Sequence, residues 1–332
     1  MGLESSLMKD QDGNDIQDFY EMPNGCICCA AKDDLIITLD TLLEKKPELD
    51  YILVETSGLA DPCQVIQTFW VDDGLNSKIE LLQTVGVIDT FNFNKKLEST
   101  HVLYDELNKP IEFTEKDLLY RQLIYADQII LNKIDLIGEE KDAILERIKK
   151  IINALNPQVK YLESTYSQMP LDNLIQIDTK QQIRQIQDQN CCLDSHDHTH
   201  NHEEEHKNSS QEHIHSHHKQ IENIDSVYFD LDGDKIVDKD RLEQLFGEIL
   251  WEKNYCQRIL RCKGTFIAKN EDGVLTEFIL QGVEEVFEFR AIQNIQTPSD
   301  DIGYKNRFLL IGLKVEEKVI ENKLKECLVS NQ

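Results

Sequence analysis

No stretch of this 332-residue chain has enough consecutive apolar residues for a membrane-spanning helix, which needs roughly 20. The longest apolar runs, YILV at 51–54 and FLLIGL at 308–313, have the length of strands. No secretory signal pattern occurs, and nine cysteines with two adjacent pairs are unlike a secreted disulfide framework. These features predict a soluble, intracellular protein that works in the cytoplasm without a membrane partner.

Basic residues are scarce. Lysine and arginine number 35 against 62 acidic residues, which leaves a net charge of -27. Nucleic acids and anionic membranes would repel such a surface, so we expect no nucleic-acid partner. An acidic surface instead suits solubility and the handling of cations.

Composition divides the chain into three parts, predicted at residues 1–188, 189–220 and 221–332. The first part alternates short apolar strands with amphipathic helices, which predicts an α/β domain with a parallel sheet. Its predicted strands are 51–55, 84–88, 127–131 and 159–162, and its predicted helices are 33–45, 116–125, 139–154 and 171–187. The middle part has almost no apolar residues, which predicts a disordered linker.

The third part has a different order of elements, with a strand, a helix, four strands and a final helix. This order predicts a small α+β domain whose helices cover one face of the sheet. Apolar residues at helical spacing in its first helix should form the core, and they are Leu242, Leu245, Phe246, Ile249 and Leu250.

Three cysteines, Cys26, Cys28 and Cys29, lie within the hexapeptide NGCICC. Thiolates select soft or borderline metals such as zinc or monovalent copper over magnesium or calcium. The spacing therefore predicts a shared metal site. The alternative is a buried cluster of reduced cysteines.

The segment LNKID follows an apolar strand and precedes a helix. There, the carboxylate of Asp135 can accept hydrogen bonds from N1-H and the exocyclic amine of guanine, a pattern that adenine does not present. Asn132 would brace the loop and contact the base, and the aliphatic stem of Lys133 would cover the face of the base. The pattern predicts selection of GTP over ATP, although the same residues can also form a simple turn between strand and helix.

The segment VETSG ends another predicted strand. Glu55 could hold the hydration shell of Mg²⁺, and the N-H of Gly58 could approach a γ-phosphate. The alternative is a turn with an exposed acid. Asp61 should cap a helix that begins at Pro62.

Nine of the ten histidines lie within one polar tract, at His196, His198, His200, His202, His206, His213, His215, His217 and His218. Several imidazoles on a flexible segment can gather around zinc, copper or nickel, which predicts a metal reservoir or sensor. Because only neutral imidazole binds metal, this binding should weaken as the pH falls through about 6.5. Cys191 and Cys192 border the tract and could contribute. The tract also fits a solvated linker.

Other candidate residues carry weaker signals. Asp89 could approach the nucleotide loop or the metal, or it could cap a helix. The tenth histidine, His101, is predicted at the surface or the edge of the core, and the isolated cysteines Cys63, Cys256, Cys262 and Cys327 are predicted to be structural. Arg258, Arg261 and Lys263 form a basic patch, interpreted as a solvated strand edge rather than a contact with a client or within the chain.

Together, NGCICC, YILVETSGLADP, FWVDDGL, VGVIDTFNF, ADQIILNKIDLI, the histidine tract, RILRCKGTF and NRFLLIG resemble the zinc-regulated GTPase metalloprotein activators, the eukaryotic branch of the CobW-like GTPases. The resemblance implies a P-loop NTPase-type parallel sheet followed by a smaller α+β CobW C-terminal domain. It also implies a low-turnover GTPase that uses Mg²⁺, binds Zn²⁺ at CxCC and delivers it to a client metalloprotein. Methionine aminopeptidase is a candidate client by this resemblance, and the protein could form a homo-oligomer. By position, Cys26, Cys28 and Cys29 match the family's metal motif, Glu55 and Gly58 its Walker B and switch element, and Asn132, Lys133 and Asp135 its guanine motif.

One departure from the family pattern is that no G-x-x-x-x-G-K-S/T segment occurs in the sequence. Its backbone N-H groups, lysine and hydroxyl normally bind phosphates and Mg²⁺. We therefore expect poor GTP hydrolysis by the chain as printed, and an N-terminally incomplete product rather than an evolved pseudo-GTPase. The alternative functions are a nucleotide-independent zinc buffer and an inactive scaffold that binds the client.

Overall fold

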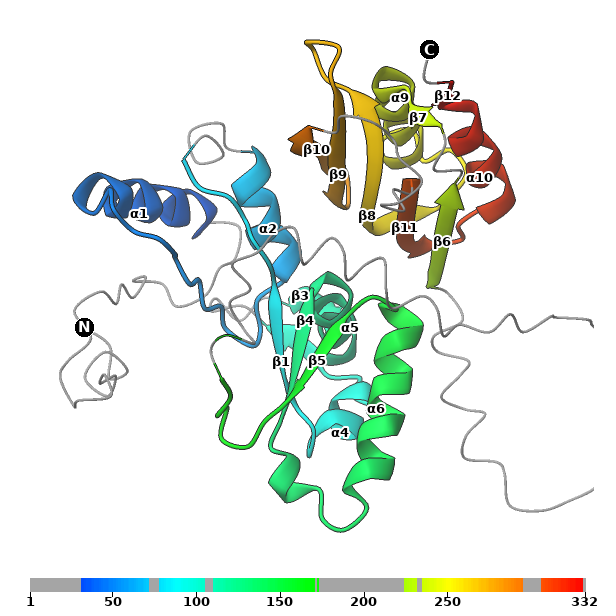
Figure 1. Cartoon of the computed structure of the whole chain (residues 1–332). Coiled ribbons are helices and arrows are strands. Elements are labelled where there is room, and N and C mark those ends of the chain that lie inside the picture. The colour runs from blue at the N-terminus through cyan, green and yellow to red at the C-terminus, as the bar shows by residue number, and fades with distance from the viewer. Residues whose placement is uncertain are drawn as a thin grey trace, which may run out of the picture.

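The computed structural model describes residues 31–71, 78–104, 110–170, 172, 224–231, 235–294 and 306–330 (Figure 1). Two larger sheets organise these residues, a parallel sheet in the first half of the chain and an antiparallel sheet in the second. Among the described helices, none is both long and apolar enough to cross a membrane. Apart from Asp172, the predicted helix 171–187 and the predicted linker lie outside the described residues.

The parallel sheet consists of β1 (Val85–Asp89), β4 (Gln128–Asn132) and β5 (Lys160–Glu163), in the order β1-β4-β5. Every residue of β4 is buried, as expected for a central strand that is covered on both faces. The helices α5 (Glu115–Tyr125) and α6 (Lys141–Leu155) contribute apolar side chains to the same core. The predicted α/β class with a parallel sheet is therefore confirmed.

Shorter elements connect these strands. They are α4 (Phe93–Leu97), the antiparallel pair β2 (Val102–Tyr104) and β3 (Pro110–Thr114), and the 3-10 turn η1 (Ile134–Leu136). α5 begins with a capping box, because Thr114 Oγ1 accepts a hydrogen bond from Asp117 N at 3.2 Å and Asp117 Oδ2 accepts one from Thr114 N at 3.0 Å. This cap sets the start of the helix that faces both halves of the protein.

Two of the described helices precede the parallel sheet. α1 (Ala31–Lys45) and α2 (Pro62–Val71) pack through Leu35 and Leu39 of α1 against Val65 and Phe69 of α2. Asp61 Oδ1 accepts a hydrogen bond from Cys63 N at 3.1 Å, so the predicted cap at the start of α2 is confirmed.

The prediction of a strand at 51–55 is wrong. This segment has no strand pairing in the structure, and 79% of Leu53 is exposed. β1 is an edge strand of the described sheet, with β4 on one side and no described strand on the other, and 60% of Val87 is exposed there. An apolar, β-branched sequence forms a strand only where it can pair with a neighbouring strand and pack one face against other residues, because β propensity largely measures that packing.

The second half forms an antiparallel sheet in the order β10-β9-β8-β11-β6. Its strands are β6 (Asp225–Leu231), β8 (Arg258–Lys269), β9 (Leu275–Val283), β10 (Val286–Asn294) and β11 (Asn306–Leu313). β7 (Ile236–Val237) pairs with β12 (Leu328–Val329) in a small second ladder.

The helices α9 (Lys239–Leu250) and α10 (Glu317–Glu326) pack on the same core as this sheet. All five residues predicted for that core are buried, namely Leu242, Leu245, Phe246, Ile249 and Leu250. The predicted α+β arrangement with helices on one face is confirmed (Figure 1).

The two halves share one apolar core. Leu260 of β8, Val283 of β9 and Leu309 and Ile311 of β11 are clustered with residues of α5, α6 and the parallel sheet. Ile259, next to Leu260 in β8, belongs instead to the cluster beneath α9 and α10. Adjacent strand residues point to opposite faces, so this sheet is covered on both sides.

The interpretation of the basic patch as a solvated strand edge is wrong for Arg261. Its guanidinium is buried and donates to the carbonyl oxygens of Ile124 at 2.6 Å and Ala126 at 2.8 Å. It also forms an ion pair with Asp127. The patch therefore makes contacts between the two halves of the chain.

Candidate functional site

The carboxyl ends of β1, β4 and β5 meet at one edge of the parallel sheet. Asp89 and Asn132 are paired in the register of β1 and β4, and Leu131 is paired with Glu163 of β5. Open α/β sheets bind ligands at this edge, where the loops that follow the strands converge. The segment LNKID follows β4 here, so its position fits a ligand-binding loop.

Hydrogen bonds hold both the side chain and the backbone carbonyl of Asn132. Its Nδ2 donates to Ser167 Oγ at 2.9 Å, and its Oδ1 accepts from Ser167 N at 3.0 Å. Thr90 Oγ1 donates to the Asn132 carbonyl oxygen at 2.7 Å. The side chain is buried, so these bonds satisfy polar groups that water does not reach.

Lys133 directly follows, with a left-handed φ of 62°. Its Nζ lies 2.7 Å from Asp89 Oδ2, which also accepts a hydrogen bond from Asn92 Nδ2 at 2.9 Å. Partial burial alone would raise the pKa of Asp89, but the hydrogen bonds from Lys133 and Asn92 outweigh it and lower the pKa to about 2. Asp89 therefore fixes the stem of Lys133, a role that the sequence left undecided.

Asp135 completes the segment within η1. Its carboxylate is exposed, and it has no hydrogen-bond or ion-pair partner among the residues that the structure describes. A carboxylate with both oxygens free can accept two parallel N-H donors. Asn132 and Lys133 are thus fixed in place, while Asp135 stays available.

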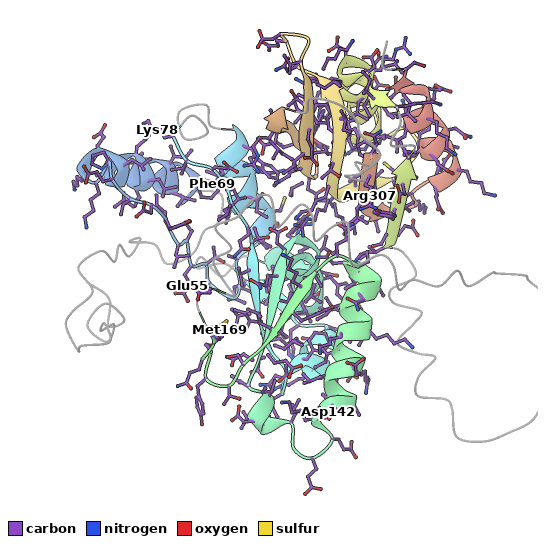
Figure 2. All side chains as sticks on the ribbon, viewed as in Figure 1. Glu55, Phe69, Lys78, Asp142, Met169 and Arg307 are labelled. Carbon is purple, nitrogen blue, oxygen red and sulfur yellow. The ribbon has the colours of Figure 1, made fainter. Side chains whose placement is uncertain are left out.

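The VETSG segment lies between α1 and α2. Figure 2 shows Glu55 on this connection, outside the sheet, and the side chain is exposed. Gln122 Nε2 of α5 donates to the carbonyl oxygen of Gly58 at 2.9 Å. A Cβ added at Gly58 would meet no described atom within 4 Å, so local packing does not require a glycine there. Within the described part of the chain, no hydrogen bond or ion pair joins Glu55 to Asn132, Lys133 or Asp135.

A buried ionic network begins three residues after Gly58. Arg121 of α5 forms two contacts with Asp61, from Nε to Oδ1 and from Nη2 to Oδ2, both at 3.0 Å. Its Nη1 lies 3.2 Å from Glu284 Oε1 in the second half of the chain. Tyr125 donates its hydroxyl to the same oxygen at 2.8 Å, and Arg258 pairs with Glu284 Oε2 at 2.6 Å. Sequence reasoning missed Arg121 and Glu284, because no local motif marks either residue.

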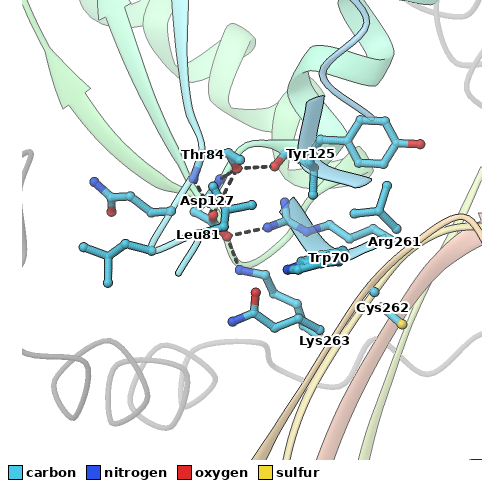
Figure 3. Close-up of a pocket in the computed structure, with 14 residues that line it drawn as sticks. Trp70, Leu81, Thr84, Tyr125, Asp127, Arg261, Cys262 and Lys263 are labelled. Atoms are coloured by element: carbon cyan, nitrogen blue, oxygen red, sulfur yellow. Dashed lines mark hydrogen bonds and ion pairs between the residues drawn. The ribbon is translucent and has the colours of Figure 1, made fainter. Parts of the chain in front are cut away.

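A second polar contact closes a pocket between the two halves (Figure 3). Asp127 pairs with Arg261 and Lys263 and accepts a hydrogen bond from Thr84 N at 2.7 Å. Burial lowers the pKa of Lys263 to about 8, and the Arg261 charge acts in the same direction. Asp127 of the first half thus joins Arg261 and Lys263 of the second half, so these contacts hold the two halves together.

The predicted metal ligands lie outside the described residues. This applies to Cys26, Cys28 and Cys29 and to all nine histidines of the tract. In the described ranges, no group of three or more His, Cys, Asp or Glu residues could hold a metal ion. The four isolated cysteines, Cys63, Cys256, Cys262 and Cys327, are buried free thiols, which confirms their structural assignment, and His101 is exposed. Burial raises the pKa of the Cys262 thiol to about 12.

Comparisons with known proteins extend these observations. Residues 1–163 match the CobW/HypB/UreG nucleotide-binding domain, and residues 226–328 match the cobalamin synthesis protein cobW C-terminal domain. A solved structure titled the Zn(II)-bound YjiA GTPase from E. coli has a TM-score of 0.55 and 20% sequence identity. That alignment covers 92% of this chain and 80% of the other, and it shows a shared fold.

Curated relatives include the protein named zinc-regulated GTPase metalloprotein activator 1 from two yeasts. The Schizosaccharomyces pombe protein is 35% identical over 53% of this chain, and the match spans only 38% of that protein's length. The Saccharomyces cerevisiae protein is 25% identical over 98% of this chain and 74% of its own length. A zinc chaperone CobW from Sinorhizobium sp is 39% identical over 36% of this chain and 35% of its own length. Because it matches both the nucleotide-binding and the C-terminal domain models, the chain belongs to the CobW family and is related to the eukaryotic zinc-regulated GTPase metalloprotein activators.

Proposed function

We propose that this protein is a GTP-dependent zinc metallochaperone. Cys26, Cys28 and Cys29 bind Zn²⁺ as cargo, and GTP hydrolysis drives its transfer to a client metalloprotein. The names of the relatives support a GTPase-linked role in zinc handling. The proposal assigns residues 1–188 to the nucleotide domain, 189–220 to a metal-binding linker and 221–332 to the C-terminal domain.

The geometry of LNKID is the observation that carries this proposal. Both polar atoms of the Asn132 side chain form hydrogen bonds with Ser167, and Lys133 Nζ lies 2.7 Å from Asp89 Oδ2. Asp135 remains exposed beside them at the carboxyl edge of the sheet. A guanine base offers two adjacent donors to such a carboxylate, whereas adenine places an acceptor at N1. The arrangement therefore favours GTP as the nucleotide.

The exposed carboxylate of Glu55 fits a role in holding the water shell of Mg²⁺. When bound, Mg²⁺ would neutralise charge on the phosphates. The open space around Gly58 leaves room for a phosphate to approach its backbone, and the bond from Gln122 fixes the carbonyl of this residue. Glu55 and Gly58 are thus assigned to the reacting end of the nucleotide.

Zinc and nucleotide are coupled in this proposal. Zinc on the three thiolates would order the chain that leads to VETSG and tighten it around the γ-phosphate. Hydrolysis would relax this segment and weaken a thiolate contact with the zinc ion. By linkage, GTP must change the affinity for zinc by the same factor by which zinc changes the affinity for GTP. The histidine tract supplies a local reservoir of zinc for the thiolates.

Calorimetric titration of Zn²⁺ with and without a non-hydrolysable GTP analogue tests this coupling. The experiment uses the chain as printed and a version extended upstream by a phosphate-binding loop, together with Cys28→Ser. We expect the analogue to change the zinc dissociation constant. Cys28→Ser should abolish zinc binding at the three cysteines, and Asp135→Ala should remove the effect of the analogue.

Asp142→Ala is the matched control, because Asp142 is an exposed acid in the first turn of α6. It should behave as the unchanged protein does. Equal zinc affinities with and without the analogue in both versions would contradict the proposal, and they would leave a zinc buffer that ignores nucleotide as the better description.

A further inference from the structure

The turn that follows β5 has an unusual backbone. Residues 165–168 form a tight turn closed by a hydrogen bond from Gln168 N to the Thr165 carbonyl oxygen at 3.0 Å. Both central residues are left-handed, with φ of 53° at Tyr166 and 57° at Ser167. Turns of this shape normally use glycine, asparagine or aspartate, because other side chains are strained there. Neither residue of this turn is one of those.

The same turn is attached to LNKID by several bonds. Ser167 exchanges two hydrogen bonds with the side chain of Asn132. Ser164 N donates to the Leu131 carbonyl oxygen at 2.9 Å, and Ile134 N lies 3.4 Å from the Ser164 carbonyl oxygen. The strained conformation is therefore held by its surroundings, which is the condition under which backbone strain persists at functional sites.

This turn carries its aromatic ring into solvent. Tyr166 is 81% exposed, and the ring makes no hydrogen bond or ring contact with the residues that the structure describes. The ring thus contributes little to packing, although the backbone beneath it is strained. Lys133 and Asp135, also exposed, belong to the loop to which this turn is bonded.

We propose that Tyr166 stacks on the purine base that Asn132 and Asp135 recognise, opposite the stem of Lys133. This inference rests on the proposed function and adds a binding residue to it. An aromatic ring stacks on the face of any base, so Tyr166 provides affinity and Asp135 provides the choice of guanine. Ser167 acts as the positioning residue, because its bonds to Asn132 align the turn with the loop.

Titration with GTP and ATP tests the proposal, both in the full chain and in the version extended upstream by a phosphate-binding loop. We expect Tyr166→Ala to weaken GTP binding by about tenfold, within the range measured when a stacking ring is removed. Tyr166→Phe keeps the ring and should bind as the unchanged protein does. Tyr104→Ala is the matched control, because Tyr104 is an exposed tyrosine on β2 and should leave binding unchanged.

Two further variants separate binding from folding. Tyr166→Gly should raise the melting temperature, because glycine adopts a positive φ without strain, and it should still lose about tenfold in GTP affinity. GTP should quench the indole fluorescence of Tyr166→Trp. When Asp135→Ala is added to this variant, the same concentration of GTP should no longer quench it.

The outcomes distinguish this inference from the function on which it rests. If Asp135→Ala removes the preference for GTP over ATP but Tyr166→Ala binds GTP with unchanged affinity, the stacking role is overturned and the guanine site stands. If neither this chain nor the version extended upstream by a phosphate-binding loop binds GTP, or if Asp135→Ala alters nothing, the guanine site is overturned together with the stacking role.

Discussion

Asp89 controls the position of Lys133 through one short contact at the edge of the sheet. Its pKa lies at about 2, below the ordinary value of 3.8, because bonds to the charged carboxylate outweigh the effect of partial burial. A carboxyl group whose pKa is lower in the folded state stabilises the fold at pH values above its ordinary pKa. That contribution disappears as the pH falls from about 4 to about 2.

Because Lys133 is about half exposed, water screens this ion pair, and replacing Asp89 by asparagine should reduce the free energy of unfolding by about 1 kcal/mol at pH 6. The difference from the unchanged protein should fall to roughly a third of that value at pH 2.5 and vanish only below about pH 2. Urea unfolding at the two pH values measures it. A difference that does not change with pH would contradict the assigned ion pair.

The residue scale also shows what local motifs reveal. Asn132, Lys133 and Asp135 were recognisable from four letters that follow an apolar strand. Ser167 and Tyr166 were not, because their importance depends on a turn 35 positions away from Asn132 along the chain. Consecutive left-handed residues without glycine leave no local trace in the sequence.

At the scale of elements, α5 links the candidate site to the rest of the molecule. Gln122 contacts Gly58, and Arg121 and Tyr125 contact Glu284. Arg121 and Tyr125 are one helical turn apart, which places both on the same face. The orientation of α5 therefore affects the VETSG connection and the second half of the chain together.

Thr114→Ala should destabilise the protein by about 1 kcal/mol, because it removes the side-chain cap of α5. Thr114→Ser retains the hydroxyl and should restore most of the loss. Thermal unfolding of the three proteins measures the effect. A loss in Thr114→Ser as large as in Thr114→Ala would show that the cap is not responsible.

The strands also show how far the local sequence predicts an element. The predicted strands 84–88, 127–131 and 159–162 lie within one residue of β1, β4 and β5. The equally apolar 51–55 has no ladder in the described structure. Pairing requires a partner in space, and hydrophobicity along the chain does not specify one.

At the scale of the whole molecule, Arg121 forms ion pairs with two largely buried acids from opposite halves of the chain. Only 9% of its side chain is exposed, and it contacts Asp61 and Glu284. Removing one partner of a buried ion pair leaves an uncompensated charge in a poorly solvated place. The cost of such a change exceeds that of losing an exposed pair.

Arg121→Met should lower the free energy of unfolding by about 3–5 kcal/mol. Arg147→Met is the control, because Arg147 is exposed on α6 and should change stability by less than about 0.5 kcal/mol. Hydrogen exchange adds a second readout, since protection should fall both at residues 57–61 and at the turn containing Glu284. Loss of protection on one side alone would contradict the link between the halves.

The sequence by itself determined the α/β class of the first half, the α+β class of the second and the core face of α9, and it marked the residues that we propose bind guanine. Those features depend on periodicity and on short motifs, which a linear chain displays directly. Only the tertiary structure decided that Asp89 holds Lys133, that Ser167 holds Asn132 and that Arg121 joins Asp61 to Glu284. These contacts connect residues that are 35 to 163 positions apart, and their formation depends on how strands, helices and charges meet in space rather than on any local preference of the chain.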